Sequence, residues 1–79
     1  MVRIAGIEAG SIAEELELEI GTRIVRINGE RVRDGIDLSF MLADTDLELE
    51  AVSPSGVRQV LEVHRHEGEP VGIVPAPCP

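Results

Sequence analysis

The sequence predicts an α+β domain that is mainly β, with six short strands and two helices. Residues 46–52 and 57–64 alternate between apolar and polar side chains, which is the period-2 pattern of strands with one solvent-facing side. Two other segments carry helix-start signals, and turn sequences separate these segments. With 79 residues the chain has room for one domain. The expected order is strand, short helix, strand, strand, helix and three further strands.

The first quarter of the chain predicts a strand followed by a short helix. Residues 2–7 are β-rich, and Ser11 stands three residues before Glu14, which is the spacing of a capping box. The helix should be about two turns long. Its apolar side would contain Ile12, Ala13 and Leu16. Its solvent-facing side would contain Glu14, Glu15, Glu17 and Glu19.

The middle of the chain predicts a strand, a turn and a longer helix. Residues 22–27 form a β-rich run that ends at Asn28 and Gly29, a pair suited to turns with positive φ. A short extended piece over residues 30–32 follows, and Asp34 then begins the second helix. The core stripe of that helix would contain Leu38, Met41 and Leu42, at positions i, i+3 and i+4.

Two alternating strands and a final extended segment complete the pattern. The side chains expected to point inward are Leu47, Leu49, Leu61 and Val63. Those expected to point outward are Glu48, Glu50, Glu62 and His64. The turn between the two strands is Ser-Pro-Ser-Gly over residues 53–56. In the final segment Pro75 and Pro77 each remove a backbone donor, so closing a core is not a sufficient explanation for it.

The charge of the chain excludes two classes of partner. It has 15 acidic residues, seven arginines and no lysine, with a formal net charge of -8. Nucleic acids and anionic membrane surfaces require clustered Lys and Arg, so we expect neither as a partner. No apolar run approaches the roughly 20 residues of a membrane span. Cys78 is the only cysteine and allows no internal disulfide, which fits the cytoplasm, and we expect a monomer there.

The sequence offers little for catalysis or metal binding. His64 and His66 stand at i, i+2 on one face of a strand, with Glu67 and Glu69 close by, so a metal site is conceivable. Two imidazoles are few for a metal site, so we interpret His64 and His66 as exposed side chains without a metal. No nucleophile elbow or phosphate-cradling glycine loop is present. We therefore expect no catalytic residue, no metal and no cofactor in this segment.

Residues 10–32, GSIAEELELEIGTRIVRINGERV, resemble PDZ domains. The residues that fall in step with the family pattern are Ser11, Ala13, Gly21, Ile24, Ile27, Asn28 and Gly29. Glu17 and Thr22 depart from it, because the family usually has Gly and Asp there. A left-handed backbone at Glu17 would cost about 1 kcal/mol relative to glycine. The resemblance implies a PDZ-like, partly open sheet or barrel of five or six strands capped by two helices.

The resemblance also implies a peptide-binding site at the C-terminal end of the chain. In PDZ domains a basic residue and a Gly-Leu-Gly-Phe-like loop precede the strand that lines the groove. Here Arg65 and the stretch 70–73, PVGI, look like these features. The backbone N–H groups of Val71, Gly72 and Ile73 would hold a carboxylate, and Ile73-Val74 would pair with the peptide. The opposite wall would contain Gly35, Ser39 and Leu42.

Some features argue against tight binding. Glu67 and Glu69 flank the loop, and an acid ~6 Å from a bound carboxylate costs roughly 0.5–1 kcal/mol. Pro75 limits pairing on the groove strand and equally suits an edge guarded against strand addition. We expect a dissociation constant of about 10 μM to 1 mM for free peptides. Phe40 would cover the rim of the groove or pack beneath the end of the second helix.

The chain is similar to particular bacterial PDZ domains, in which the sequence begins one strand later than in animal members. Met1, residues 34–44 and the VGI at 71–73 resemble the PDZ-like N-terminal segment of a radical-SAM iron-sulfur protein family. A parent of that kind would use a 4Fe-4S cluster and S-adenosylmethionine, but no cluster motif occurs here. The ending is also similar to PDZ domains of site-2 metalloproteases.

Three roles remain open for this segment. The first is recognition of an extended peptide or protein C-terminus by a domain over residues 1–75, with 76–79 as a tail or the start of a linker. The second is a docking domain of a radical-SAM enzyme whose groove is filled by the enzyme's own chain. The third is a structural adaptor that uses another surface, such as the acidic side of the short helix.

Overall fold

A computed structural model of the chain describes residues 1–66 and 69–76. The strands are β1 (Val2–Ile7), β2 (Arg23–Ile27), β3 (Glu30–Arg31), β4 (Asp46–Val52), β5 (Arg58–His64) and β6 (Ile73–Pro75). The helices are α1 (Ile12–Glu15) and α2 (Gly35–Met41). The mainly β, α+β fold expected from the sequence is confirmed, with each element in its expected place in the order.

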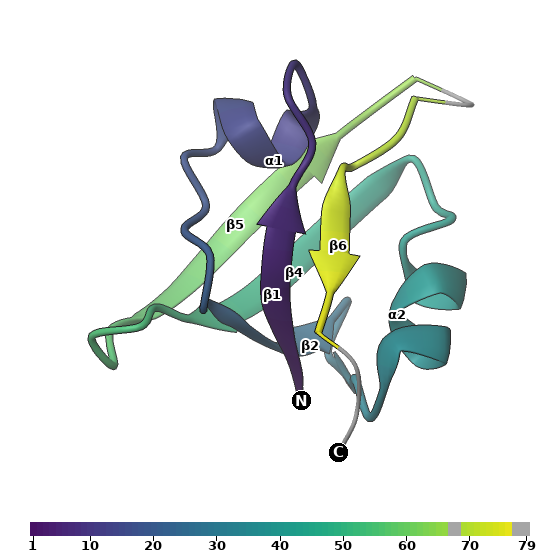
Figure 1. Cartoon of the computed structure of the whole chain (residues 1–79). Coiled ribbons are helices and arrows are strands. Elements are labelled where there is room, and N and C mark those ends of the chain that lie inside the picture. The colour runs from purple at the N-terminus through teal and green to yellow at the C-terminus, as the bar shows by residue number, and fades with distance from the viewer. Residues whose placement is uncertain (67–68, 77–79) are drawn as a thin grey trace.

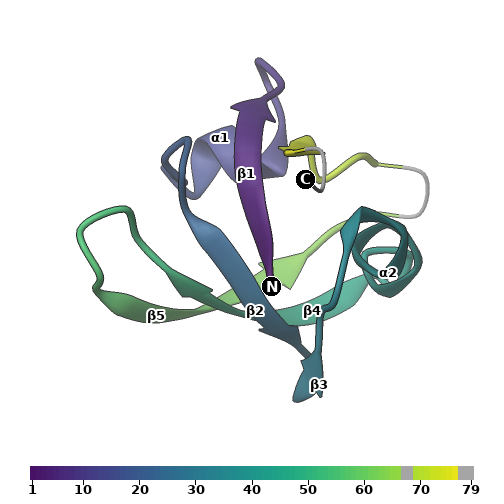
Figure 2. The same ribbon diagram turned by 60° about the horizontal axis from the view of Figure 1, so that its bottom comes forward.

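All strand pairs are antiparallel. The sheet has the order β5-β4-β2-β1-β6, and β3 pairs with β2 beside this path. The sheet bends at β2, so that β1 and β6 cross over the layer formed by β4 and β5 (Figures 1 and 2). β5 pairs with β4 over seven consecutive residues without a register shift. β6, from the far end of the chain, pairs with β1.

The core lies inside this bend and is entirely aliphatic. Its buried side chains are Val2, Ile4, Ala13, Leu18, Ile24, Ile27, Val32, Leu38, Leu47, Leu49, Ala51, Val63 and Val71. The inward alternation expected for β4 and β5 is confirmed, although Leu61 near the sheet edge is only half-buried. Burial of these apolar side chains is the main force that holds the bent sheet together.

Helix α1 is shorter than the two turns expected from the sequence. Ser11 caps it as predicted, because its hydroxyl accepts a hydrogen bond from the N–H of Glu14. The helix ends after Glu15, and Glu17 has a left-handed backbone with φ of 58°. A non-glycine residue in that conformation cannot continue a right-handed helix. Glu17, where the family usually has glycine, thus has the left-handed backbone that glycine adopts easily.

Helix α2 begins as predicted at Asp34, whose carboxylate accepts the N–H of Asp37 at 2.8 Å. Leu38 is buried, and Met41 and Leu42 pack half-buried against the core, as the predicted stripe requires. Figure 1 shows α2 beside β6, on the side of that strand away from β1. Among the described residues, no helix has the length and apolar character needed to cross a bilayer.

Candidate functional site

β6 has one paired edge and one edge that faces α2. The N–H of Glu8 donates to the carbonyl of Gly72 at 2.9 Å, just before Ile73 pairs with Ile7. This bond makes the Ile7–Ile73 pair a non-hydrogen-bonded one. The N–H and C=O of Ile73 therefore point away from β1 and toward α2. The alternation along the strand gives Pro75 the same orientation, but proline has no N–H to offer.

The loop that enters β6 has two successive backbone donors, the N–H groups of Gly72 and Ile73, that point away from neighbouring elements. The carbonyl of Val71 accepts the N–H of Ala13, and that of Gly72 accepts the N–H of Glu8, both at 2.9 Å. No peptide bond in the described chain is cis, so the N–H of each following residue points the opposite way. The N–H of Gly72 consequently faces away from α1, and the N–H of Ile73 faces away from β1. Such a pair next to a residue of positive φ forms an anion-binding nest.

Gly72 permits this geometry in two ways. Its φ is +86°, a conformation that side chains rarely adopt, and a Cβ at this position would overlap the side chain of Ser11. Ser11 is itself fixed, since its hydroxyl donates to the carbonyl of Glu8 at 2.6 Å. Ser11 and Glu8 thus support the loop. The sequence marks Ser11 as a helix cap and as part of the PDZ pattern, but nothing in it signals a contact between residues 11 and 72.

The guanidinium of Arg65 connects the loop to the C-terminal end of α2. Its Nη2 donates to the carbonyl of Leu42 at 2.6 Å, and its Nε donates to the carbonyl of Asp44 at 2.9 Å. Its Nη1 donates to the carbonyl of Glu69 within the loop itself. Three of its donors are therefore used for carbonyls of the protein. Direct contact of Arg65 with a peptide carboxylate stays a prediction, and its structural role is to position the loop beside the helix.

The predicted helix wall lies on the β6 side of α2. A Cβ placed on Gly35 would be 3.4 Å from the Pro75 side chain, so the start of α2 touches the end of β6. One turn later Ser39 is exposed, and its hydroxyl donates to the carbonyl of Gly35 at 3.1 Å. Leu42 is half-buried at the other end. α2 therefore meets β6 at Pro75, and Ser39 and Leu42 follow one and two turns further along the chain.

The remaining loop and strand positions have separate places. The side chain of Val71 is buried in the core, so that only its backbone is available to a ligand. Ile73 packs half-buried against the core. Val74 is paired with Gly6 and lies against it, with a side chain that is 43% exposed. Residues 67, 68 and 77–79 lie outside the described residues. The structure therefore does not test the predictions that involve Glu67, Gly68, Pro77 and Cys78.

Of the two alternatives for Phe40, packing beneath the end of the second helix is wrong. Its side chain is 77% exposed, so it does not pack beneath the helix end. It borders a hollow of about 280 Å³ on a different side of α2, away from β6. That hollow is lined by Ile27, Asn28, Glu30, Phe40, Met41 and Asp44. The helical period explains the difference, because Phe40 lies about 100° around the helix from Ser39.

The two histidines do not gather metal ligands within the described part of the chain. No group of three or more His, Cys, Asp or Glu side chains there could hold an ion. His64 Nδ1 instead lies 2.9 Å from the carboxylate of Asp46, and its Nε2 lies 3.9 Å from that of Glu62. The hydrogen bond with Asp46 is the main reason that the pKa of His64 is raised above its ordinary value of 6.5.

The sequence was compared with models of known protein families. A family model described as PDZ domain matches residues 3–52, more than half of the sequence. The chain belongs to the PDZ domain family. PDZ domains are protein-interaction modules and are generally non-catalytic, in agreement with the absence of catalytic motifs from the sequence. The comparison with curated proteins finds no match.

The matched region of this PDZ domain runs from β1 to the end of β4. The match thus includes the PDZ motif residues and the whole of α2. β5, the loop and β6 follow the match and complete the sheet next to β1. The nest and the edge of β6 that faces α2 are therefore independent of the family match.

Proposed function

We propose that this PDZ domain binds the C-terminal end of an extended peptide between β6 and α2. One observation carries the proposal: the N–H of Ile73 points away from β1, toward the side of the strand where α2 lies, and the N–H of Gly72 beside it points away from α1. Two neighbouring backbone donors suit a terminal carboxylate, because its two oxygens accept hydrogen bonds.

The peptide would add to the sheet as a short strand along β6. The carbonyl of Ile73 would accept an N–H of the peptide near its C-terminus, in the manner of β-augmentation. Leu42 and Ile73 would supply half-buried apolar side chains from the two walls, so an aliphatic C-terminal residue is expected there. Pro75 offers no N–H for the next rung, and its contact with Gly35 narrows the space. Recognition therefore rests on the last two or three residues of the peptide.

The affinity and the charge preference follow from the same features. A ladder interrupted at Pro75 supports a dissociation constant of about 10 μM to 1 mM. Glu69 lies exposed next to the loop, and the whole chain has a net charge of -8. Residues upstream of the peptide carboxylate should therefore be basic, and binding should weaken as salt screens these charges.

A titration monitored by NMR tests the proposal. The ¹⁵N-labelled chain would be titrated with a library of peptides that end in an aliphatic residue with a free carboxylate. We expect amide shifts to concentrate at Gly72 and Ile73 and along α2 at Ser39 and Leu42. If saturating peptides leave residues 69–76 and 35–43 unmoved, the groove is not a peptide receptor.

A pair of neighbouring substitutions on α2 supplies the control. Ser39→Trp would place a bulky side chain on the helix wall beside β6, whereas Phe40→Trp would exchange one exposed aromatic residue for another away from it. We expect Ser39→Trp to weaken peptide binding at least 10-fold and Phe40→Trp to leave it unchanged. Equal effects of the two substitutions would remove the β6–α2 space from the binding site.

A second candidate is that the groove is filled by another part of the parent protein. The interrupted ladder at Pro75 favours it, because a segment tethered to the same chain binds at high effective concentration and needs few contacts. We infer that the parent is bacterial and cytoplasmic, of the radical-SAM iron-sulfur family suggested by the resemblance. One cysteine cannot hold a 4Fe-4S cluster, so the cluster and S-adenosylmethionine would be bound elsewhere in the parent.

This family assignment has a simple test. The sequence that follows residue 79 in the parent gene should contain a Cys-x-x-x-Cys-x-x-Cys motif, and its absence would contradict the assignment without affecting the peptide-binding proposal. The order of elements supports the permuted bacterial type, since the strand beside α2 comes last in the chain. The proposed groove is built within one chain, so a monomer is sufficient for it, and nucleic acid is not expected as a ligand.

A further inference from the structure

The outer edge of β5 is a second place where a strand could add to the sheet. β5 stands at the end of the strand order, and Figure 2 shows it at the outside of the layer that it forms with β4. Proteins commonly protect such an edge with proline, a bulge or charged side chains, lysine above all. Residues 58–64 contain no proline or lysine, and their pairing with β4 has no bulge. The edge is therefore long and regular, and its charged side chains are of both signs.

Alternate residues of β5 turn their backbone groups toward this edge. The N–H of Arg65 donates to the carbonyl of Thr45 at 2.9 Å, which makes His64 a non-hydrogen-bonded position against β4. The residues whose N–H and C=O face outward are therefore Arg58, Val60, Glu62 and His64. Within residues 1–66 and 69–76, no hydrogen bond from another strand or loop reaches these backbone groups. All four side chains are exposed as well.

We propose that two copies of the chain associate by antiparallel pairing of their β5 edges around a two-fold axis at Val60. This register places Arg58 opposite Glu62 of the partner subunit, and by symmetry Glu62 opposite Arg58 of the partner subunit. Val60, which is 58% exposed, meets the partner's Val60. These residues all carry outward-facing backbone groups, so each pair can exchange two hydrogen bonds. Opposite charges and apolar pairs across strands are both stabilising.

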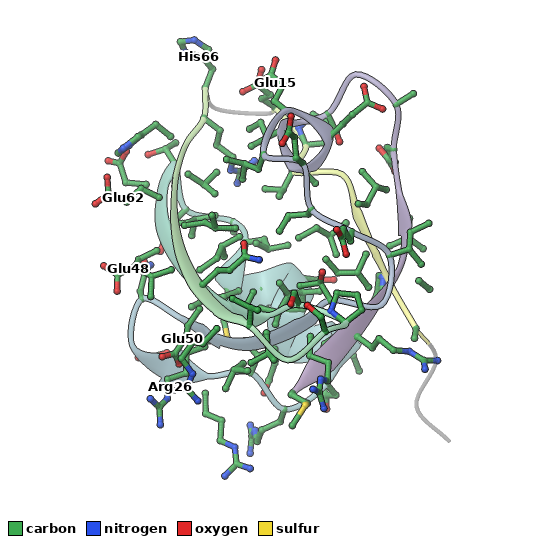
Figure 3. The ribbon with its side chains drawn as sticks, turned by 90° about the vertical axis from the view of Figure 1, so that its left-hand side faces the viewer. Glu15, Arg26, Glu48, Glu50, Glu62 and His66 are labelled. Carbon is green, nitrogen blue, oxygen red and sulfur yellow. The ribbon has the colours of Figure 1, made fainter. Side chains whose placement is uncertain are left out.

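The charge pattern around Glu62 points to a second copy as the occupant. Glu62 lies directly opposite Glu48 on β4, and like charges in that position are unfavourable. Figure 3 shows the two carboxylates on the same side of the sheet. The cation nearest to Glu62 in its own chain is His64 at 3.9 Å, which is charged only when protonated. The partner's Arg58 would lie on the side of Glu62 that faces away from Glu48.

The alternative register separates these charges. If the two-fold axis passed through Leu61 instead, Arg58 would face the partner's His64 and Val60 would face the partner's Glu62. Both ion pairs and the valine pair would be lost. The sequence of β5 is thus self-complementary in one register, which is what an isologous interface between identical chains requires.

The dimer should be weak, because it joins one strand of each copy and two chains of net charge -8. Interfaces of this size belong to the transient class, and we expect a dissociation constant of about 0.1–1 mM. At micromolar concentration the chain is then the monomer expected from the sequence. The proposal does not depend on the peptide-binding groove, which lies at β6.

Amide hydrogen exchange at two concentrations tests the pairing. At about 20 μM and about 2 mM, in roughly 0.15 M salt, the amides of Gln59, Leu61 and Val63 should be protected alike, because they bond to β4. The amides of Arg58, Val60 and Glu62 should gain about 2- to 5-fold protection at the higher concentration, as a dissociation constant of about 0.1–1 mM requires. Exchange at these three amides that does not depend on concentration would overturn the proposal.

Charge exchange between two variants tests the register. Arg58→Glu and Glu62→Arg each place like charges in the proposed pair, so each variant alone should dimerise at least 5-fold more weakly than the unaltered chain. A mixture of the two variants restores both opposite-charge pairs and should form heterodimers. If the mixture associates no better than either variant alone, the Val60 register is wrong.

Val60→Lys supplies the control for folding. It would bring two like charges together at the two-fold axis, and dimerisation should be lost. Within one chain it would face Glu50 across the strand pair, so the fold should be as stable as that of the unaltered chain. A variant that is folded and still dimerises would contradict the proposal.

Discussion

Two residues with positive φ, Gly72 and Gly10, show how differently one backbone conformation can constrain a site. Gly10 has a φ of +75°, and a Cβ there would have nothing within 4 Å. Gly72 has a φ of +86°, and a Cβ there would overlap Ser11. The first glycine is needed only for its conformation, whereas the second also lets the loop approach α1 closely. The orientation of the two nest donors depends on that approach.

Replacing these glycines by alanine separates the two effects. Gly10→Ala should lower the free energy of unfolding by about 1 kcal/mol, which is the cost of a left-handed backbone. Gly72→Ala should lower it by about 2–4 kcal/mol, because Ser11 or the loop must also move. Urea unfolding of both variants measures the difference. Equal losses would mean that the loop can shift away from Ser11 without cost.

His64 gives the fold a modest dependence on pH. Its folded-state pKa is raised by the hydrogen bond with Asp46, while in the unfolded chain it titrates near 6.5. A raised pKa means that the folded state binds the proton more tightly. The stabilisation is therefore complete below about pH 6.5 and is lost as the pH rises through the folded-state pKa.

The substitution Asp46→Asn isolates this contribution. The difference in stability between the unaltered chain and the variant should be largest near pH 5.5 and should shrink toward pH 8. Denaturant unfolding at several pH values measures it. A difference that grows with pH would show that the Asp46–His64 pair acts mainly when the histidine is neutral. Both side chains are mostly exposed, so the effect should be small.

At the scale of elements, Arg65 determines how three segments meet. Its guanidinium holds the carbonyls of Leu42 and Asp44 after α2 and that of Glu69 in the loop. A planar group with several fixed donors suits this task, and a lysine ammonium does not reproduce it. The distance between α2 and the loop, and hence the width of the proposed groove, depends on this one side chain.

Arg65→Lys should therefore be disruptive although it keeps the charge. We expect the free energy of unfolding to fall by roughly 1–2 kcal/mol and amide exchange to accelerate near Leu42 and Glu69. Arg58→Lys on the same strand is the matched control, because Arg58 makes only a surface ion pair with Glu50 at 3.6 Å. That change should cost less than about 0.5 kcal/mol. Equal costs would contradict the positioning role of Arg65.

The sequence predicted elements better than it predicted contacts between them. Period-2 alternation placed β4 and β5 within a residue of their bounds, and capping residues located the start of both helices. The length of α1 was overestimated, since its apolar spacing continues through Leu16 while the left-handed backbone at Glu17 ends the helix. The partners of Arg65 could not be predicted, because they are backbone carbonyls that any residue would supply.

At the scale of the whole molecule, the two end strands of the bent sheet have different surroundings within the described residues. β6 ends the order on one side and faces α2, and β5 ends it on the other and faces solvent. The two edges differ in protection, since β6 ends in Pro75 and β5 has no proline. The short, interrupted edge suits selective recognition of a chain end, and the long edge suits pairing with a second copy.

The central claim is that the N–H groups of Gly72 and Ile73 bind a peptide carboxylate, and matched peptides test it most directly. Two peptides of identical sequence, with a basic upstream residue and an aliphatic last residue, would differ only in a free or an amidated C-terminus. Calorimetric titration should give an affinity at least 10-fold higher for the free acid, and the preference should shrink as salt is raised. Equal affinities for the acid and the amide would contradict the account.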